Sequence, residues 1–367
     1  MSPGEVAGRV QRRAVVLVDD ASWRRAHGLW RRAWEPEGER ILRPGSLAES
    51  PLGVMTPDRA ALLGPESGAA AQEVLGRADA ALAGRVGLLG YPEVELEPEF
   101  DRDHFTGRRW PDQHGKLLDY RTAQYGDPKW IWELNRCQEL PLLCVAWLLS
   151  GEERYARTAL ERMLAWLGGS SPGRGIAWSN GFEAGLRGIS FALSFDALRG
   201  SKQLDADHAR RILLGLWQHG RYIVQDHSFG SSANNHLVGE AAGLATIALL
   251  APELRASDSW LRRALSWLDG ESDRQILPDG TGAEQAFTYH LFVVDLLLLV
   301  VALLEARGRT VPLAIRAALE RSADALALQV GPGEPDPAYG DSDDGRAFVL
   351  DGADARTAAG VAASLAS

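Results

Sequence analysis

The stretch LFVVDLLLLVVALL, residues 291–304, decides the fold class of this chain. It has 14 residues and carries Asp295, whereas a helix that crosses a bilayer needs about 20 consecutive apolar residues. A helix built from this stretch would be apolar around most of its circumference, and such a helix has to be covered on more than one side. The stretch therefore predicts a buried helix at the centre of a helical protein.

Further helical patterns surround this stretch, from about residue 130 onward. Each segment repeats apolar residues at spacings of three and four, and most segments stop at a glycine, as helix C-termini prefer. The sequence has no comparable series of alternating strand patterns. The helical segments are residues 130–150, 152–167, 180–198, 206–227, 231–250, 257–268, 283–307 and 312–330.

Helices of this length joined by short loops predict successive antiparallel pairs. Since several of them are apolar on most sides, an inner ring of helices wrapped by an outer ring would bury them. We therefore expect an all-α fold, an (α/α) toroid or incomplete α/α barrel of antiparallel helix pairs. A solenoid of helix pairs would give a similar pattern, but the sequence shows no fixed-period repeat.

The sequence predicts three parts along the chain. Residues 1–115 form a less regular N-terminal segment with helices, one of them over residues 69–86, packed on the toroid. Within this segment residues 88–115 are predicted to be a long loop, and loops of that length in a compact domain are commonly functional. Residues 116–350 form the toroid, and residues 351–367 form a small-residue tail or a truncated linker.

Charge and composition argue against two classes of partner. The 367 residues carry a net charge of -10, so no general attraction to nucleic acid or to an anionic membrane is expected. The apolar run near the N-terminus is too brief for a signal peptide, which predicts a cytoplasmic protein. Cys137 and Cys144 stand seven residues apart on one predicted helix, and we expect both to be buried free thiols.

Two asparagines and a histidine open the segment SSANNHLVGEAAGLATIALL, residues 231–250. One asparagine, Asn234, is enough to cap the helix. Asn235 and His236 exceed what capping requires. The positive end of the helix favours a neutral imidazole and helps to hold an anion, so this pair is a candidate binding site.

A second polar cluster precedes the central helix, in DGTGAEQAFTYHLFVVDLL, residues 279–297. It contains Glu284, Tyr289 and His290, and polarity at a helix start accounts for part of it. Trp130 and Trp178 stand at helix starts, where an aromatic face can stack on a sugar ring, although packing is the commoner role of a single tryptophan.

No metal and no cofactor are expected. His236 and Glu240 stand four residues apart, but two ligands without a third make a weak zinc site. The segment GDSDDG, residues 340–345, lacks the glutamate that closes a calcium loop at its twelfth position, where the sequence has Gly352.

Several of these segments together resemble the heparinase II/III-like polysaccharide lyases and their alginate and oligoalginate lyase relatives. The order and spacing of the segments cover roughly residues 115–346, and the segments are specific as a set. The resemblance implies an α/α toroid, in agreement with the helix pattern. The matching segments are KWIWELNR (129–136), WSNGFEAGLRGISF (178–191), NNHLVGEAAGLA (234–245), DGTGAEQAFTYHLFVVDLLLL (279–299) and YGDSDDGR (339–346).

The resemblance also implies a reaction, the β-elimination of a polysaccharide that contains uronic acid. Asn235 would bind the uronate carboxylate, His236 would neutralise it or abstract a proton, and Tyr289 would serve as acid or as both base and acid. The implied partner is an acidic polysaccharide or oligosaccharide, with no nucleic acid and no membrane, and the oligomeric state stays open. We expect the substrate to contact Trp130, Arg136, Trp178, Asn180, Glu183, Glu240, Glu284 and His290.

Members of this family normally continue beyond the toroid into a β-sandwich with another catalytic histidine, and many are periplasmic or secreted. We expect this chain to lack that β-sandwich, since the toroid pattern is followed by the small-residue segment DGADARTAAGVAASLAS. Two alternative functions remain open. One is a carbohydrate-binding protein without turnover, and the other is a glycoside hydrolase on an α/α barrel that uses two carboxylates among Glu183, Glu240, Glu284 and Asp341.

Overall fold

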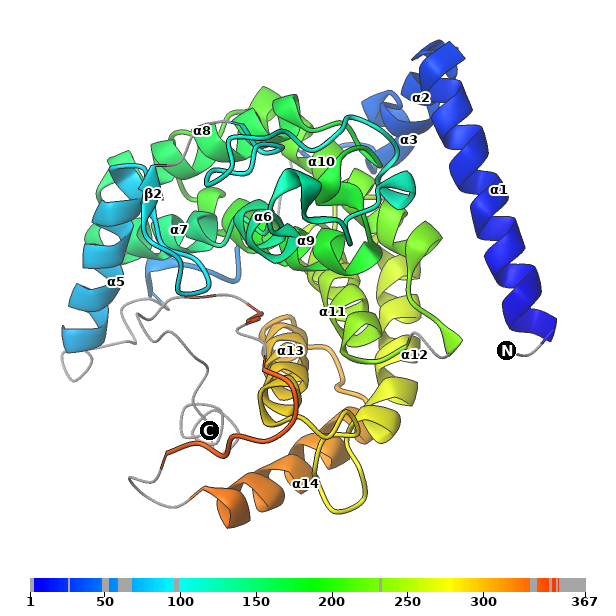
Figure 1. Ribbon diagram of the computed structural model, residues 1–367. Helices are drawn as coiled ribbons and strands as arrows, with labels where there is room; N and C mark the ends of the chain where they lie inside the picture. Colours follow the sequence, from blue (N-terminus) through cyan, green and yellow to red (C-terminus); the bar gives the residue numbers. More distant parts are fainter. Residues whose placement is uncertain are drawn as a thin grey trace.

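The computed structural model describes residues 3–25, 27–47, 53–58, 68–95, 99–230, 233–330, 335–342, 345–347 and 349. The predicted tail, residues 351–367, lies outside the described residues. Within those ranges the chain is mostly helical (Figure 1). The first elements are α1 (Pro3–Arg25), α2 (His27–Trp34), α3 (Gly38–Ile41), α5 (Gly68–Leu82), β1 (Arg85–Val86), β2 (Val94–Glu95), η2 (Gly115–Leu117) and η3 (Ala123–Tyr125).

The remaining elements build the body of the protein. They are α6 (Pro128–Asn135), α7 (Glu139–Ser150), α8 (Glu153–Gly169), η4 (Ile176–Trp178), α9 (Gly181–Leu198), α10 (Ala206–Asp226), α11 (Asn235–Leu250), α12 (Ser257–Gln275), α13 (Phe287–Ala306) and α14 (Leu313–Gln329).

Helices α7 to α14 form two curved rows (Figure 1). The inner row is α7, α9, α11 and α13, in which each helix packs on the next. Each inner helix also packs on the helix that follows it in the chain, and these partners, α8, α10, α12 and α14, form the outer row. The rows curve into an incomplete ring, which confirms the predicted all-α toroid of antiparallel helix pairs.

The two central inner helices, α9 and α11, run in the same direction and approach closely. Every residue of α9 is buried, as the apolar pattern predicts. A Cβ built on Gly181, at the start of α9, would lie beside Glu240 near the start of α11, and one built on Gly188 would lie beside Ile247 further along. Both helices therefore place their N-terminal ends at the same end of the toroid.

A glycine makes this approach possible, and its replacement gives a stability prediction. A Cβ on Gly243 would lie 2.4 Å from the carbonyl oxygen of Gly185, so Gly243→Ala forces α9 and α11 apart. We expect a loss of about 1–3 kcal/mol in the free energy of unfolding, measured with urea. Gly270→Ala is the control, because a Cβ there meets nothing within 4 Å and should stabilise α12 by about 0.5–1 kcal/mol. Equal effects of the two variants would contradict the close approach.

The segment 130–150, predicted as one helix, forms two helices instead. Helix α6 ends at Asn135, and Cys137 has a left-handed backbone with φ of 53° before α7 begins. The cause is Pro141, because a proline inside a continuous helix has no N–H and its ring collides with the carbonyl four residues earlier, here that of Cys137. Cys137 and Cys144 are buried free thiols as predicted, but they do not share a helix.

The N-terminal segment also differs from its prediction in detail. Helix α5 ends at Leu82, and Gly84 has a φ of 77°, so the chain reverses before residue 86. Strand β1 replaces the end of the predicted helix, and its antiparallel partner β2 occupies part of the predicted loop 88–115. Beyond it the loop packs on the toroid, since the side-chain Nδ2 of Asn135 donates to the carbonyl oxygen of Phe100 at 2.8 Å. The boundary between residues 115 and 116 stays a prediction.

Helix α13 contains the apolar stretch that indicated the fold. By length and composition alone it could cross a membrane, but 61% of its most apolar window is buried inside the protein. It packs on α11, α12 and α14. The helix therefore has the surroundings of a core helix, as its sequence predicts.

Candidate active site

The N-terminal ends of the inner helices α9, α11 and α13 lie close together, at the same end of the toroid. Phe182, in the first turn of α9, stacks on His236 of α11 with ring centroids 4.6 Å apart. The same ring meets Phe292 of α13 edge to face at 5.9 Å. Because a helix N-terminus carries partial positive charge, three such ends in one place favour an anionic ligand.

The two asparagines at the start of α11 have different roles. The side-chain oxygen of Asn234 accepts a hydrogen bond from the backbone N–H of His236 at 3.0 Å, so Asn234 is the helix cap. Asn235 is buried and does not take part in the cap. Its side-chain nitrogen donates to both carboxylate oxygens of Glu284, at 2.9 Å each. This contact joins the start of α11 to the turn that leads into α13.

The other two predicted catalytic residues lie in the first turns of the same helices. His236 follows Asn235 on α11 and is half-buried against Phe182. Tyr289 is the third residue of α13, five positions after Glu284, and is half-buried as well. An amide, an imidazole and a phenol are therefore carried by the adjoining ends of two packed helices.

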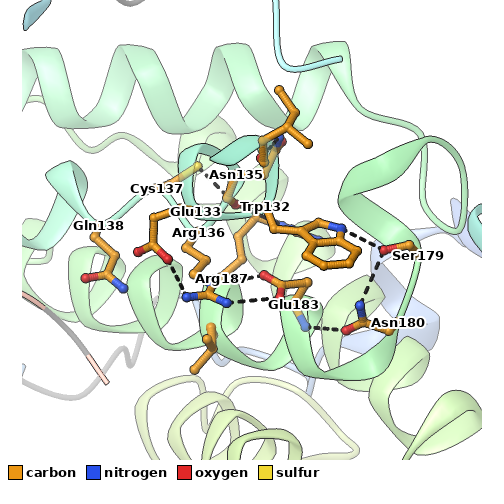
Figure 2. A network of polar contacts seen from close by, with 12 residues as sticks. Trp132, Glu133, Asn135, Arg136, Cys137, Gln138, Ser179, Asn180, Glu183 and Arg187 are labelled. Carbon is orange, nitrogen blue, oxygen red and sulfur yellow. Dashed lines mark hydrogen bonds and ion pairs between the residues drawn. The ribbon is translucent and has the colours of Figure 1, made fainter. Parts of the chain in front are cut away.

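Figure 2 shows a buried ionic network at the end of α6 and the start of α9. The guanidinium carbon of Arg136 lies 5.7 Å from the centroid of the Phe182 ring. The guanidinium of Arg136 donates through Nε and Nη2 to the two carboxylate oxygens of Glu183, at 2.9 and 3.1 Å. Its Nη1 donates to Glu133, and Asn180 caps α9 by accepting from the backbone N–H of Glu183 at 2.9 Å. Of the predicted substrate-binding residues, Arg136 and Asn180 thus both contact Glu183. Whether they also contact a substrate stays a prediction.

Both predicted tryptophan platforms are covered by protein. Trp130 and Trp178 are each only 1% exposed. Trp130 packs against Phe105, and Trp178 packs against His219. Both rings pack inside the protein in this structure, and neither presents a face on which a sugar could stack.

His290 is also buried, inside the toroid. Its Nε2 lies 3.1 Å from the hydroxyl of Ser322, and burial lowers the pKa of the imidazole to about 4, so the ring is neutral at pH 7. The residue as a whole is 2% exposed, so little of its ring is available for contact with a ligand. A binding role for His290 stays a prediction.

Glu240 is buried beside the start of α9. Its carboxylate oxygens accept from the backbone N–H and the hydroxyl of Ser228, at 2.6 and 3.0 Å. Burial raises the pKa of Glu240 to about 8, against these hydrogen bonds, and the neighbouring Asp226 raises it further while Lys116 lowers it. The uncharged carboxyl is therefore the favoured form at neutral pH.

The raised pKa of Glu240 predicts a pH dependence of stability. Between the unfolded pKa of about 4.3 and the folded value, the native state binds a proton that the unfolded state has lost. The free energy of unfolding contributed by Glu240 therefore falls as the pH rises from about 5 to about 8 and is level above that. Urea unfolding at a series of pH values gives the free energy of unfolding of the unmodified protein and of Glu240→Gln. Plotted against pH, these two free energies should diverge across this range. Parallel curves would contradict the raised pKa.

Phe182 is a residue of this region that the sequence did not single out. It stands between the predicted Asn180 and Glu183, and its contacts with His236 and Phe292 connect α9 to α11 and α13. Its place in the first turn of a helix, where polar residues surround it, was the available signal.

A hollow of about 520 Å³ opens beside the contact between Asn235 and Glu284. It provides room for part of a ligand next to the start of α11. In the described part of the chain no group of three or more His, Cys, Asp or Glu side chains is placed to hold a metal ion. The hollow is lined by Gly230, Ala233, Asn234, Arg274, Gln275, Ala283 and Glu284.

Comparison with known proteins finds relatives that are similar in sequence and solved structures that are similar in fold. Heparin-sulfate lyase of Pedobacter heparinus is 23% identical over 190 residues, which cover 50% of this chain and 28% of that protein. The heparin-sulfate lyase of Bacteroides thetaiotaomicron is 23% identical over 194 residues, 48% of this chain and 27% of that protein. The matched part of this chain therefore spans less than a third of the length of either relative.

The solved structures agree in fold. A crystal structure of heparinase III matches with a TM-score of 0.56 at 19% identity, over 74% of this chain and 41% of that one. Heparan sulfate lyase HepC from Pedobacter heparinus matches with a TM-score of 0.51 at 19% identity, over 81% and 42%. A family model described as Heparinase II/III N-terminus matches residues 96–357, which is most of the chain. The chain belongs to the heparinase II/III family.

Proposed function

We propose that this chain carries the uronate-binding part of a polysaccharide lyase that cleaves by β-elimination. The observation that carries the proposal is the contact between the start of α11 and the turn before α13. It joins the amide of Asn235 to the turn before α13, and His236 and Tyr289 belong to the first turns of these two helices. This arrangement suits a ligand that carries a carboxylate.

The reaction explains why an amide and an imidazole are useful there. β-Elimination removes the proton on C5 of the uronate, next to its carboxylate, and that proton is far too weakly acidic while the carboxylate is fully charged. Donors such as Asn235 and His236 would stabilise the enolate that develops, as in an oxyanion hole. Once the C5 proton has left, a double bond forms between C4 and C5, and the bond from C4 to the glycosidic oxygen breaks.

Tyr289 is the proposed group for proton transfer. A tyrosine has an ordinary pKa of about 10, so it can act as a base only where hydrogen bonds or positive charge stabilise its phenolate. The helix N-termini at this site provide positive potential of that kind. Tyr289 would then accept the C5 proton and deliver it to the departing oxygen, or would serve as the acid alone while His236 abstracts the proton.

A panel of polysaccharides tests the proposal. Glycosaminoglycans, alginate and bacterial exopolysaccharides that contain uronate are incubated with the protein, and the ultraviolet absorbance of unsaturated uronate ends is followed. We expect such ends from at least one member of the panel. New reducing ends without this absorbance would instead indicate hydrolysis, and binding without any product would indicate a carbohydrate-binding protein.

A further inference from the structure

We infer that Glu284 is a positioning residue, which fixes the amide of Asn235 in the orientation that a uronate carboxylate requires. This inference rests on the proposed function. One oxygen of Glu284, Oε1, accepts from both the backbone N–H and the side-chain Nδ2 of Asn235, at 2.9 Å each. The other oxygen, Oε2, accepts from the same Nδ2 at 2.9 Å.

The chemistry of the contact selects one orientation of the amide. An ionised carboxylate accepts hydrogen bonds and cannot donate them, so Glu284 holds the NH2 side of Asn235 and excludes the flipped amide. The two oxygens of one carboxylate subtend a small angle at Nδ2, whereas the two N–H bonds of an amide diverge widely. One N–H therefore points at Glu284, and the other points elsewhere. That second N–H is the donor we assign to the substrate.

The turn that carries Glu284 is held firmly. It belongs to a tight reversal in which the backbone N–H of Ala283 donates to the carbonyl oxygen of Gln275 at 2.8 Å. The next residue, Gln285, has a φ of 54°, an unfavourable value for a residue that is not glycine. Such strained backbone persists where the surroundings enforce it, and it is concentrated at functional sites.

The surroundings that enforce this turn come from the segment after α14. The backbone N–H of Phe287 donates to the carbonyl oxygen of Tyr339 at 3.1 Å. A Cβ on Gly340 would lie 2.3 Å from the carbonyl oxygen of Gln285, so the two backbones pack directly on each other. The carboxylate of Glu284 is therefore presented to Asn235 by two segments far apart in the sequence.

Two substitutions of Glu284 separate positioning from acid or base catalysis. Glu284→Gln keeps one oxygen, which can accept from the backbone N–H and from the side-chain Nδ2 of Asn235 as Oε1 does now. We therefore expect kcat to stay within about 3-fold of the unmodified value. Glu284→Ala frees the amide, and we expect kcat to fall by about 100-fold with little change in KM, as for a misplaced catalytic group. If Glu284 were an acid or base, the two variants would be equally inactive, which would overturn the inference.

A double-mutant cycle tests whether Glu284 acts through Asn235. Once Asn235 is replaced by alanine, removing Glu284 should cost kcat little more, so the two losses should not multiply. Glu305→Ala is the control, because Glu305 pairs with Arg316 on the surface and its small effect should add independently. Losses that multiply for Glu284→Ala and Asn235→Ala would show two independent roles and would overturn the inference.

Thermal unfolding of the same variants keeps the inference separate from the proposed function. The Tm of the double variant should lie close to that of the less stable single variant, because Glu284→Ala and Asn235→Ala break the same contact. Absence of unsaturated product from the unmodified protein would reject the proposed function, and with it the role at a substrate. Additive Tm losses together with an active unmodified protein would reject the positioning of Asn235 alone.

Discussion

Tyr289→Phe is expected to abolish cleavage of the uronate polysaccharide while substrate affinity stays near the unmodified level. The ring remains in the first turn of α13, and only the phenolic O–H is lost. General acid and base catalysis contributes about 10²- to 10⁴-fold to a rate, and a residue that both accepts and delivers the proton should stand at the upper end, so we expect kcat to fall by about 10³-fold or more. Initial rates of unsaturated uronate formation give kcat, and calorimetric titration of an oligosaccharide gives the affinity.

The control for this variant is Tyr155→Phe. The hydroxyl of Tyr155 donates to Asp79 at 2.8 Å, on the side of the molecule where α5 and α8 meet, and takes no part in the proposed site. Its loss should lower stability by about 1 kcal/mol and leave turnover unchanged. If Tyr289→Phe kept more than about a tenth of the activity, the phenol would not be the proton-transfer group.

Asn235→Ala is expected to lower kcat by about 10²- to 10³-fold, the usual cost of losing one donor to a developing oxyanion. The affinity for substrate should change much less, because the donor matters most when charge builds up on the carboxylate during the reaction. Steady-state rates of unsaturated uronate formation, with kcat and KM separated, measure both effects.

The neighbouring Asn234→Ala provides a matched control for this second variant. Asn234 caps α11, so its replacement should cost about 1 kcal/mol of stability and leave kcat largely intact. Replacing the two adjacent asparagines should therefore have different effects: Asn235→Ala lowers turnover, and Asn234→Ala lowers stability. Equal losses of kcat for both variants would mean that Asn235 acts only by supporting the helix start.

Most of the helical fold could be predicted from the sequence, because it depends on local periodicity and on glycine at helix ends. The apolar circumference of residues 291–304 indicated an inner helix, and α13 occupies that position. The resemblance to the heparinase II/III family is confirmed by the family model that matches residues 96–357. The break at Cys137 was missed because the helical spacing continues across it, although Pro141 was a usable signal.

The candidate site was only partly predictable. The cap at Asn234 follows from local chemistry, and it is observed. The contact between Asn235 and Glu284 joins residues 49 positions apart, and it depends on a strained turn that no local pattern specifies. Packing was the commoner role expected of a single tryptophan, and Trp130 and Trp178 are buried, but the residues that cover them come from other segments and could not be predicted. Long-range packing of this kind decides which polar and aromatic side chains stay accessible.

A carboxyl-reduced substrate tests the central claim most directly. A uronate polysaccharide that the protein cleaves and the same polymer with its carboxylates reduced to alcohols are incubated side by side, and unsaturated ends and new reducing ends are both measured. We predict unsaturated ends from the first polymer and no cleavage of the second, because the amide of Asn235 then has no carboxylate to neutralise. Cleavage of the reduced polymer at a comparable rate would contradict the account.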